Sequence, residues 1–230
     1  MSIIDVSEGM DNDPRLHKRY YVHETLTRKG LVAVLTLFSK LVMVVQAEGS
    51  EHVPSEGPVV LVSNHMTNFD VFPMQLSIKR PIFFMAKAEL HRNPVMDYFL
   101  RKGGAFPVYR GQQDEWAKRQ AERVLEAGQV LGLFPEGTRS KGRGLQPAKT
   151  GAARFAIKYQ CPIVPMAIDG SQRVLKTFPR RARIRVRIGE PIYPQRGEGP
   201  LALIDRVMYS IAAMLPPELR GVYADLPTER

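Results

Sequence analysis

A histidine and an aspartate stand five residues apart, directly after an apolar run of the chain. The segment VVLVSNHMTNFD places His65 and Asp70 behind residues 59–63. A carboxylate beside an imidazole fixes the ring tautomer and leaves the other nitrogen free to take a proton from a hydroxyl. On a helix this spacing separates the two side chains by about 140°, so they meet only if His65 lies in the turn before the helix. We expect general-base chemistry here, with a purely structural contact as the alternative.

Two further polar clusters also follow apolar runs. LGLFPEGTRS supplies Glu136, Gly137, Thr138 and Arg139, and GGAFPVYRG supplies Arg110. A glycine lets a ligand approach the backbone, and N–H groups at a turn bind anions. The forked guanidinium of arginine suits phosphate. Because open α/β sheets carry their sites at the carboxyl ends of strands, we expect the three clusters to lie at one edge of a sheet.

The elements that must position these residues alternate between strand and helix. Six runs are β-rich: 59–63, 82–86, 105–109, 130–134, 163–168 and 182–188. Helical spacing of apolar residues follows Gly111 and recurs at 152–159 and 204–215. Strands that alternate with helices predict an α/β fold, with a mostly parallel central sheet flanked by helices.

The first 46 residues differ in character from the rest. A polar, charged lead-in precedes residues 30–47, an apolar stretch interrupted by Lys40 and Gln46. The stretch falls short of the roughly 20 apolar residues that a spanning helix needs. Two interpretations stay open: a helix that lies in the membrane interface, or a core helix that runs into a strand. We expect 1–46 to be a lead-in and membrane-interface helical segment, and 47–230 to be the catalytic domain.

Positive charge is concentrated in one part of the chain. The net charge is +10, and residues 137–188 hold 13 Lys or Arg against one acid, Asp169. Such a field faces a polyanion. Aromatic residues do not interleave with the basic ones, and no nucleic-acid-binding motif is present, so a nucleic-acid module is disfavoured. Four arginines alternate with apolar residues near the end of this stretch: Arg181, Arg183, Arg185 and Arg187. This pattern predicts an edge strand whose cationic face meets anionic lipid or phosphate groups, or one that only protects the edge.

Cysteine and histidine content narrows the chemistry further. The single cysteine, Cys161, excludes a disulfide framework and a cysteine zinc site, and it favours a reducing compartment. The five histidines show no ligand spacing, so we expect no metal. Apart from His65, they carry no motif and we expect them at the surface: His17, His23, His52 and His91.

Four sequence blocks resemble those of the glycerolipid acyltransferase family, which includes the 1-acylglycerol-3-phosphate acyltransferases. They are NHMTNFD at 64–70, GAFPVYR at 104–110, FPEGTRS at 134–140 and IVPM at 163–166. The family often has valine where Met166 stands, which makes the fourth block weakly specific. The resemblance covers roughly residues 50–190.

This resemblance implies acyl transfer from acyl-CoA or acyl-carrier protein to the free hydroxyl of 1-acylglycerol-3-phosphate, giving phosphatidic acid for phospholipid biosynthesis. His65 would be the general base and Asp70 its orienting carboxylate, with no bound cofactor. The acceptor phosphate and the oxyanion would be held by residues from three strand ends: Lys87, Arg110, Glu136, Gly137, Thr138 and Arg139. Related members act on glycerol-3-phosphate, lysophospholipids or mannolipids, so the acceptor stays open. The expected location is the cytoplasmic face of an anionic membrane, with peripheral or monotopic attachment.

Overall fold

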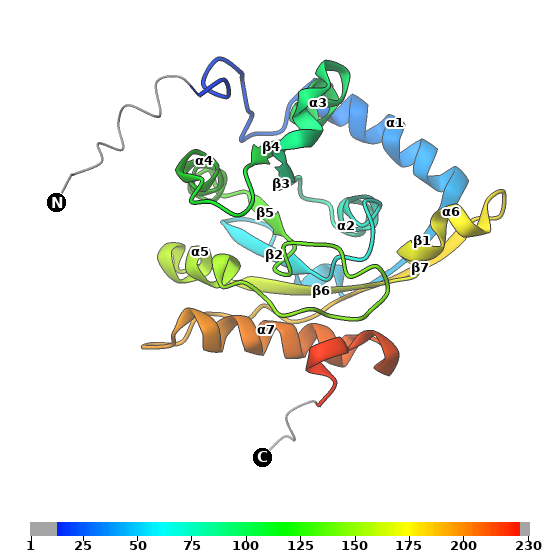
Figure 1. The fold of residues 1–230 in the computed structure, drawn as a ribbon, viewed down its shortest axis with the longest axis vertical. Helices are drawn as coiled ribbons and strands as arrows, with labels where there is room; N and C mark the ends of the chain where they lie inside the picture. The colour runs from blue at the N-terminus through cyan, green and yellow to red at the C-terminus, as the bar shows by residue number, and fades with distance from the viewer. Residues whose placement is uncertain (1–12, 226–230) are drawn as a thin grey trace.

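A seven-stranded sheet forms the centre of the molecule (Figure 1). The computed structural model describes residues 13–225 of the chain. The strands are β1 (Met43–Glu48), β2 (Val59–Ser63), β3 (Ile82–Lys87), β4 (Ala105–Val108), β5 (Val130–Leu133), β6 (Ile163–Asp169) and β7 (Ala182–Ile188). Their order across the sheet is β1-β7-β6-β2-β5-β3-β4. Strands β6, β2, β5, β3 and β4 are mutually parallel, and only the β6–β7 pairing is antiparallel. The expected α/β fold with a mostly parallel sheet is confirmed.

Helices cover both faces of this sheet. They are α1 (Leu26–Val42), α2 (Val71–Ser77), α3 (Pro94–Lys102), α4 (Glu115–Glu126), α5 (Gly151–Tyr159), α6 (Val174–Thr177) and α7 (Pro200–Met214). Short 3₁₀ turns are η1 (Ser50–His52), η2 (Ala88–Arg92), η3 (Ser171–Arg173), η4 (Pro217–Leu219) and η5 (Gly221–Tyr223). Helices α4, α5 and α7 pack on one face, while α1 and α2 lie on the other (Figure 1).

The core lies between the sheet and these helices. Every residue of β2 is buried, as expected for a central strand of a parallel sheet that is covered on both faces. Helix α7 buries the stripe that its spacing predicted, including Ile204, Val207 and Ile211. Strand β2 is therefore held on both sides by packed, water-free layers. This packing restricts the movement of the residues that directly follow Ser63.

Strand β7 is not an edge strand, so that expectation is wrong. It pairs with β1 on one side and with β6 on the other. Its alternation of buried and exposed residues shows only that one face of the strand is open. Alternation carries no information about neighbours within the sheet. The arginine face is also partly neutralised, because Arg187 Nε lies 3.6 Å from Glu48 Oε2.

The described part of the N-terminal region packs against the rest of the molecule. Arg15 Nη1 lies 2.6 Å from Asp114 Oδ2, and Lys18 Nζ lies 2.9 Å from Asp97 Oδ2. Residues 1–12 of the expected lead-in lie outside the described residues. The boundary expected at 46/47 falls within β1. The division into two functional units stays a prediction.

Asp97 also receives a histidine that we expected at the surface. His91 is buried, and its Nδ1 lies 2.8 Å from Asp97 Oδ1. The surface expectation is therefore wrong for His91. His91 and Asp97 are spaced along a turn and the start of a helix much as His65 and Asp70 are. The sequence does not distinguish the two pairs, whereas the structure shows that their surroundings differ.

Helix α1 directs most of its apolar side chains outward. Its buried residues are Arg28 and Ser39, while Leu26, Val34, Leu37, Phe38 and Leu41 are exposed. The helix continues directly into β1, as the helix-to-strand interpretation has it. Within residues 13–225, no helix combines the length and the apolar character needed to cross a membrane.

Candidate active site

The residues expected to do chemistry follow the carboxyl ends of neighbouring parallel strands. His65 follows β2, and Arg139 belongs to the loop after β5. Lys87 ends β3, and Arg110 comes two residues after β4. Since these strands are parallel, all four residues lie at the same edge of the sheet. The structure thus brings the three predicted clusters to one edge.

His65 and Asp70 are in contact. His65 lies in the extended turn before α2, and Asp70 is the residue that precedes this helix. Nδ1 of the ring is 2.8 Å from Asp70 Oδ2. An imidazole that donates its Nδ1 proton to a carboxylate presents Nε2 as a proton acceptor. The geometric condition set by the five-residue spacing is met.

Asp70 is held by an unusually complete set of donors. Its side chain is fully buried. Besides His65, Oδ2 accepts the main-chain N–H of Met66 at 2.7 Å and of Thr67 at 2.8 Å. Oδ1 accepts the hydroxyls of Thr67 at 3.2 Å and Ser171 at 2.5 Å. Together these donors fix the orientation of the Asp70 carboxylate.

The main chain of His65 is fixed by the loop after β5. Its N–H donates to Glu136 Oε1 at 2.8 Å, and its carbonyl accepts the N–H of Ser140 at 2.7 Å. The imidazole stacks on Phe134, with ring centroids 4.0 Å apart and an interplanar angle of 18°. Residues of the FPEGTRS block therefore hold both the main chain and the ring of His65 in place.

Glu136 lies beneath the site and does not face outward. It is 4% exposed, and its second oxygen accepts the N–H of Gln146 at 3.0 Å. The carboxylate thus joins His65 to the loop at 141–150. Burial raises the pKa of Glu136 to about 7, against the effect of the two main-chain donors, and the nearby charge of Asp70 adds to the rise.

The raised pKa of Glu136 gives a test of pH-dependent stability. An unfolded glutamate loses its proton near 4.5, whereas folded Glu136 keeps it to about 7. Between these values the folded state binds more protons, so the free energy of unfolding falls as pH rises, by on the order of 3 kcal/mol. We expect the Tm of the wild type to fall, relative to Glu136→Gln, by roughly 5–10 °C from pH 5 to 7.

The wild type and Glu136→Gln are compared by how steeply Tm changes with pH, and not by the absolute value of Tm. Glutamine places an N–H₂ group against the Gln146 N–H, so the variant is less stable at every pH. Other titrating groups are common to both proteins and cancel. Parallel Tm curves from pH 5 to 8 would show that Glu136 is ionised throughout, contrary to the expectation.

Gly137 brings the backbone of this loop into the site. Its φ of +67° lies in the left-handed region, and a Cβ there would stand 3.2 Å from Nζ of Lys149. The N–H of Gly137 already donates to Phe134 O at 3.0 Å. The main-chain N–H groups of Thr138 and Arg139, by contrast, donate to no other main-chain group of the described residues.

Three exposed cations lie at or just after the carboxyl ends of β3, β4 and β5: Lys87, Arg110 and Arg139. Arg139 and Arg110 form no ion pair with any residue from 13 to 225, whereas Lys87 Nζ lies 3.1 Å from Glu89 Oε1. Strand β4 is two positions from β5, which places Arg110 on the order of 10 Å from the β5 loop at strand spacing. An anion larger than a single carboxylate would be needed to bind both arginines.

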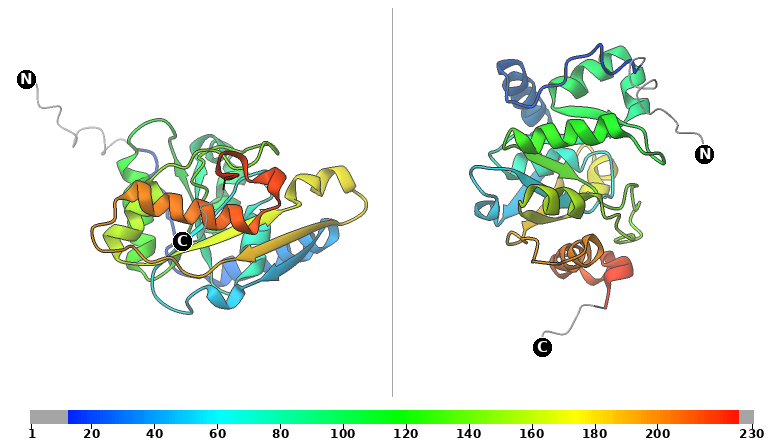
Figure 2. Two further views of the ribbon diagram at one scale, coloured as in Figure 1. Left: turned by 90° about the horizontal axis from the view of Figure 1, so that it is seen from below. Right: turned by 90° about the vertical axis from the view of Figure 1, so that its left-hand side faces the viewer.

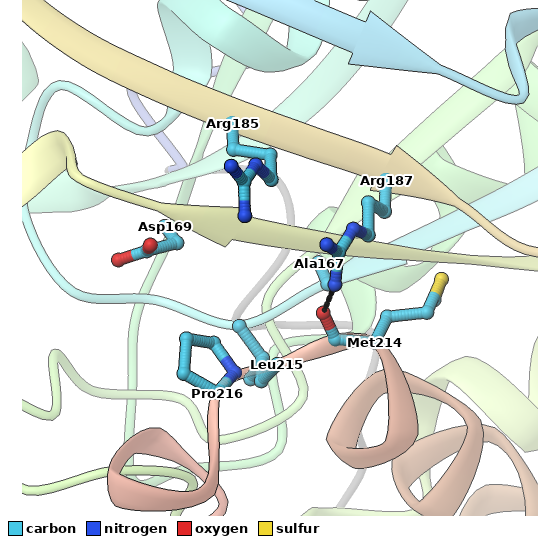
Figure 3. Close-up of a pocket in the computed structure, with 7 residues that line it drawn as sticks. All are labelled: Ala167, Asp169, Arg185, Arg187, Met214, Leu215 and Pro216. Carbon is cyan, nitrogen blue, oxygen red and sulfur yellow. Dashed lines mark hydrogen bonds between the residues drawn. The ribbon is translucent and has the colours of Figure 1, made fainter.

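The arginine face of β7 borders a separate small pocket (Figure 3). Arg185 and Arg187 line it together with Asp169 and the end of α7. Arg187 Nη1 donates to the carbonyl of Met214 at 2.8 Å. At least part of the basic stretch at 137–188 therefore serves local contacts.

Sequence reasoning missed the side chains that join β6 to the histidine block. Asn64 Nδ2 donates to Ile168 O at 2.9 Å, and Asn64 Oδ1 accepts the Ile168 N–H at 2.8 Å. Ser171, one turn farther along, reaches Asp70. A position directly after a buried strand was the available signal for Asn64. Ser171 follows the fourth block and had no signal of its own.

The C-terminal turns support the Glu136 loop from the side away from His65. Leu145 N donates to Leu219 O at 3.0 Å, and Val222 N donates to Leu145 O at 3.1 Å. The hydroxyl of Tyr223 accepts the N–H of Ala148 at 3.2 Å. Figure 2 shows these red turns beside the green loop. The turns at 217–223 thus contribute to the shape of the loop that holds Glu136.

The single cysteine takes no part in this arrangement. Cys161 is buried before β6, and burial raises the pKa of its thiol to about 11. A protonated, buried thiol is a poor nucleophile. Cys161 is therefore poorly suited to act as a nucleophile.

The chain is similar to known proteins over more than half of its length. Residues 44–169 match the Acyltransferase family. The chain belongs to the acyltransferase family. One relative, the 1-acyl-sn-glycerol-3-phosphate acyltransferase of Bacillus subtilis, is 31% identical to this acyltransferase over 150 residues, which are 65% of the chain and 74% of the relative.

Two further proteins are similar to about two thirds or more of this acyltransferase. The chloroplastic 1-acyl-sn-glycerol-3-phosphate acyltransferase BAT2 of Brassica napus is 33% identical over 159 residues, 66% of the chain and 46% of the relative. The chain thus spans about half the length of several relatives and three quarters of the Bacillus protein. The crystal structure of the 1-acyl-sn-glycerophosphate acyltransferase PlsC of Thermotoga maritima matches with a TM-score of 0.65 and 26% identity, over 80% of this chain and 78% of that one.

Proposed function

We propose that this acyltransferase moves an acyl group from a thioester, acyl-CoA or acyl-carrier protein, to the free hydroxyl of 1-acylglycerol-3-phosphate. The observation that carries the proposal is the contact of His65 with a buried, fully bonded Asp70, beside a loop that holds Arg139. The activity for which the relatives are named, 1-acyl-sn-glycerol-3-phosphate acyltransferase, supports this acceptor. The product is phosphatidic acid.

The proposed reaction needs one base and one anion-binding loop. Nε2 of His65 takes the proton of the acceptor hydroxyl as its oxygen attacks the thioester carbonyl carbon. The carbonyl oxygen becomes an oxyanion, which the N–H groups of Thr138 and Arg139 bind. The C–S bond then breaks, and the leaving thiolate takes the proton back from His65. Arg139, Arg110 and Lys87 hold the phosphate of the acceptor through charge-assisted hydrogen bonds.

An acceptor panel tests this proposal. Purified protein is given labelled acyl-CoA with lysophosphatidate, glycerol-3-phosphate, lysophosphatidylcholine or a mannolipid, and kcat/KM is measured for each. We expect lysophosphatidate to be the best acceptor. A higher kcat/KM for any other acceptor would contradict the acceptor assignment, and no transfer to any of the four would contradict the activity.

The proposed place of the reaction is the cytoplasmic face of a membrane, with α1 lying on its surface. Support comes from the burial pattern of this helix, in which a charged side chain is buried and large apolar side chains are exposed. Arg28 is buried, where its guanidinium donates to Ile82 O at 3.0 Å and to Gly103 O at 3.3 Å, whereas Leu37 and Phe38 face outward. An exposed apolar face beside lysines suits the interface of an anionic bilayer. The single cysteine fits a reducing compartment.

Flotation with anionic liposomes tests this attachment. Replacing both Leu37 and Phe38 with serine is expected to lower the membrane-bound fraction, with an apparent partition coefficient about 100-fold smaller, since each side chain contributes about 1.5–3 kcal/mol on burial. Serines at Tyr193 and Leu201 form the matched control, because these two are also exposed but lie at the α7 side of the sheet. Equal flotation of the two double variants would contradict attachment through α1.

A further inference from the structure

The turn after β6 carries a serine into the buried part of the site. Gly170 has a φ of +97°, and a Cβ at this position would stand 2.3 Å from the carbonyl oxygen of Arg183. Only glycine fits there. The tight turn brings Ser171 back beneath the strand end, where it is 1% exposed. A serine this deeply buried needs a partner for its hydroxyl.

That partner is the carboxylate of Asp70. Ser171 Oγ donates to Oδ1 at 2.5 Å, while His65 occupies Oδ2. The other donors to Asp70 are Met66 and Thr67, which belong to the same turn as His65. Within residues 13–225, Ser171 is thus the one donor to this carboxylate from outside the turn.

A donor inside the turn and a donor outside it restrain the Asp70 carboxylate in different ways. Bonds from Met66 and Thr67 move with the turn and hold Asp70 only relative to it. The bond from Ser171 ties Oδ1 to β6, which is itself joined to the β2 end by two hydrogen bonds between Asn64 and Ile168. Rotation of the carboxylate group would break this bond together with those from Met66 and Thr67, so Ser171 adds an anchor outside the turn that keeps Oδ2 directed at the imidazole.

We infer that Ser171 is a positioning residue for the His65–Asp70 pair, acting by fixing the orientation of the Asp70 carboxylate. The inference rests on the proposed function, since it assumes that His65 acts as a base. It gives the fourth sequence block a role: β6 delivers the serine to the site. A residue that orients a reactive side chain through a hydrogen bond typically contributes about 10- to 100-fold to activity.

A double-mutant cycle on kcat tests the inference. We expect Ser171→Ala to lower kcat about 10-fold or more and to leave both KM values unchanged. In the Asp70→Asn background, the same change is expected to have no further effect, because the group through which Ser171 acts is already altered. Multiplying effects in the double variant, or a change confined to KM, would overturn the inference.

The matched control is Ser77→Ala on α2. Ser77 is also buried, and its hydroxyl donates at 2.7 Å to Pro73 O within its own helix. We expect this variant to keep the wild-type kcat. If Ser171→Ala does not fold, Ser171→Cys is measured in its place, because cysteine keeps the volume and offers only a weak S–H donor.

Histidine ring signals provide a readout that does not depend on turnover. In ¹⁵N NMR spectra at pH 8, with His65 assigned through its absence in His65→Ala, we expect the wild type to show the Nδ1–H tautomer. Ser171→Ala is expected to show a mixture of tautomers. An unchanged tautomer in that variant would overturn the inference, even if no acceptor were turned over. Absence of turnover in the wild type would instead contradict the proposed function.

Discussion

Replacing His65 with alanine is expected to lower kcat/KM for acyl transfer by about 10²–10⁴-fold, while the protein stays folded. The imidazole is the group at this sheet edge whose Nδ1 is bonded to a buried carboxylate, which leaves Nε2 to accept the hydroxyl proton. Turnover of lysophosphatidate with labelled acyl-CoA measures the loss. Thermal unfolding of the same preparation shows that the fold is kept.

A second histidine offers a matched control for this variant. His91 is buried and makes a contact of the same 2.8 Å length, with Asp97, in the turn after β3. We expect His91→Ala to lower the free energy of unfolding and to retain most of the turnover. Wild-type rates in folded His65→Ala would contradict the proposed mechanism. Equal losses in both histidine variants would assign the effect to stability.

Replacing Arg139 with alanine is expected to raise the KM for the acceptor about 10- to 100-fold, because a hydrogen bond to a charged group contributes about 1.5–3 kcal/mol. Arg139 is exposed beside Gly137 and forms no ion pair within the described chain, so it is available for a phosphate. Initial rates at varied lysophosphatidate, with acyl-CoA saturating, measure the effect.

The control for Arg139 is an exposed arginine at the opposite edge of the sheet. Arg196 lies beyond β7, in a segment that passes the amino end of β6, as the bridge between Ile192 and Ile163 shows. We expect Arg196→Ala to leave both KM values unchanged. If Arg139→Ala raised only the KM for the acyl donor, the placement of the two substrates would be reversed.

Much of the fold was predictable from periodicity, and the failures have a common cause. The six expected β-rich runs coincide with β2 to β7, because short apolar runs bounded by turn residues report local structure. Strand β1 was not separable from α1, since apolar residues continue across Val42 and Met43 without a break. Whether β7 has a neighbour on each side depends on residues far away in the chain, which alternation cannot report.

The residues of the candidate site also divide into those that the sequence could identify and those that it could not. His65, Asp70 and Arg139 could be found because their types and spacing suit a definite chemistry. The role of Glu136 was not predictable, because both its partners are main-chain N–H groups that carry no sequence signal. Ser171 is a common residue type, and only the fold brings it to Asp70 from so far along the chain.

The place of β1 in the sheet has a consequence for the order of events during synthesis. Within the described chain β1 pairs only with β7, and Met43 lies opposite Ala182. At about 5–20 residues per second, the ribosome releases α1 and β1 on the order of ten seconds before their partner strand exists. During that interval the apolar face of α1 is exposed with no sheet behind it. Under the proposed attachment through α1, a nascent chain in this state would have time to reach a bilayer before its sheet is complete.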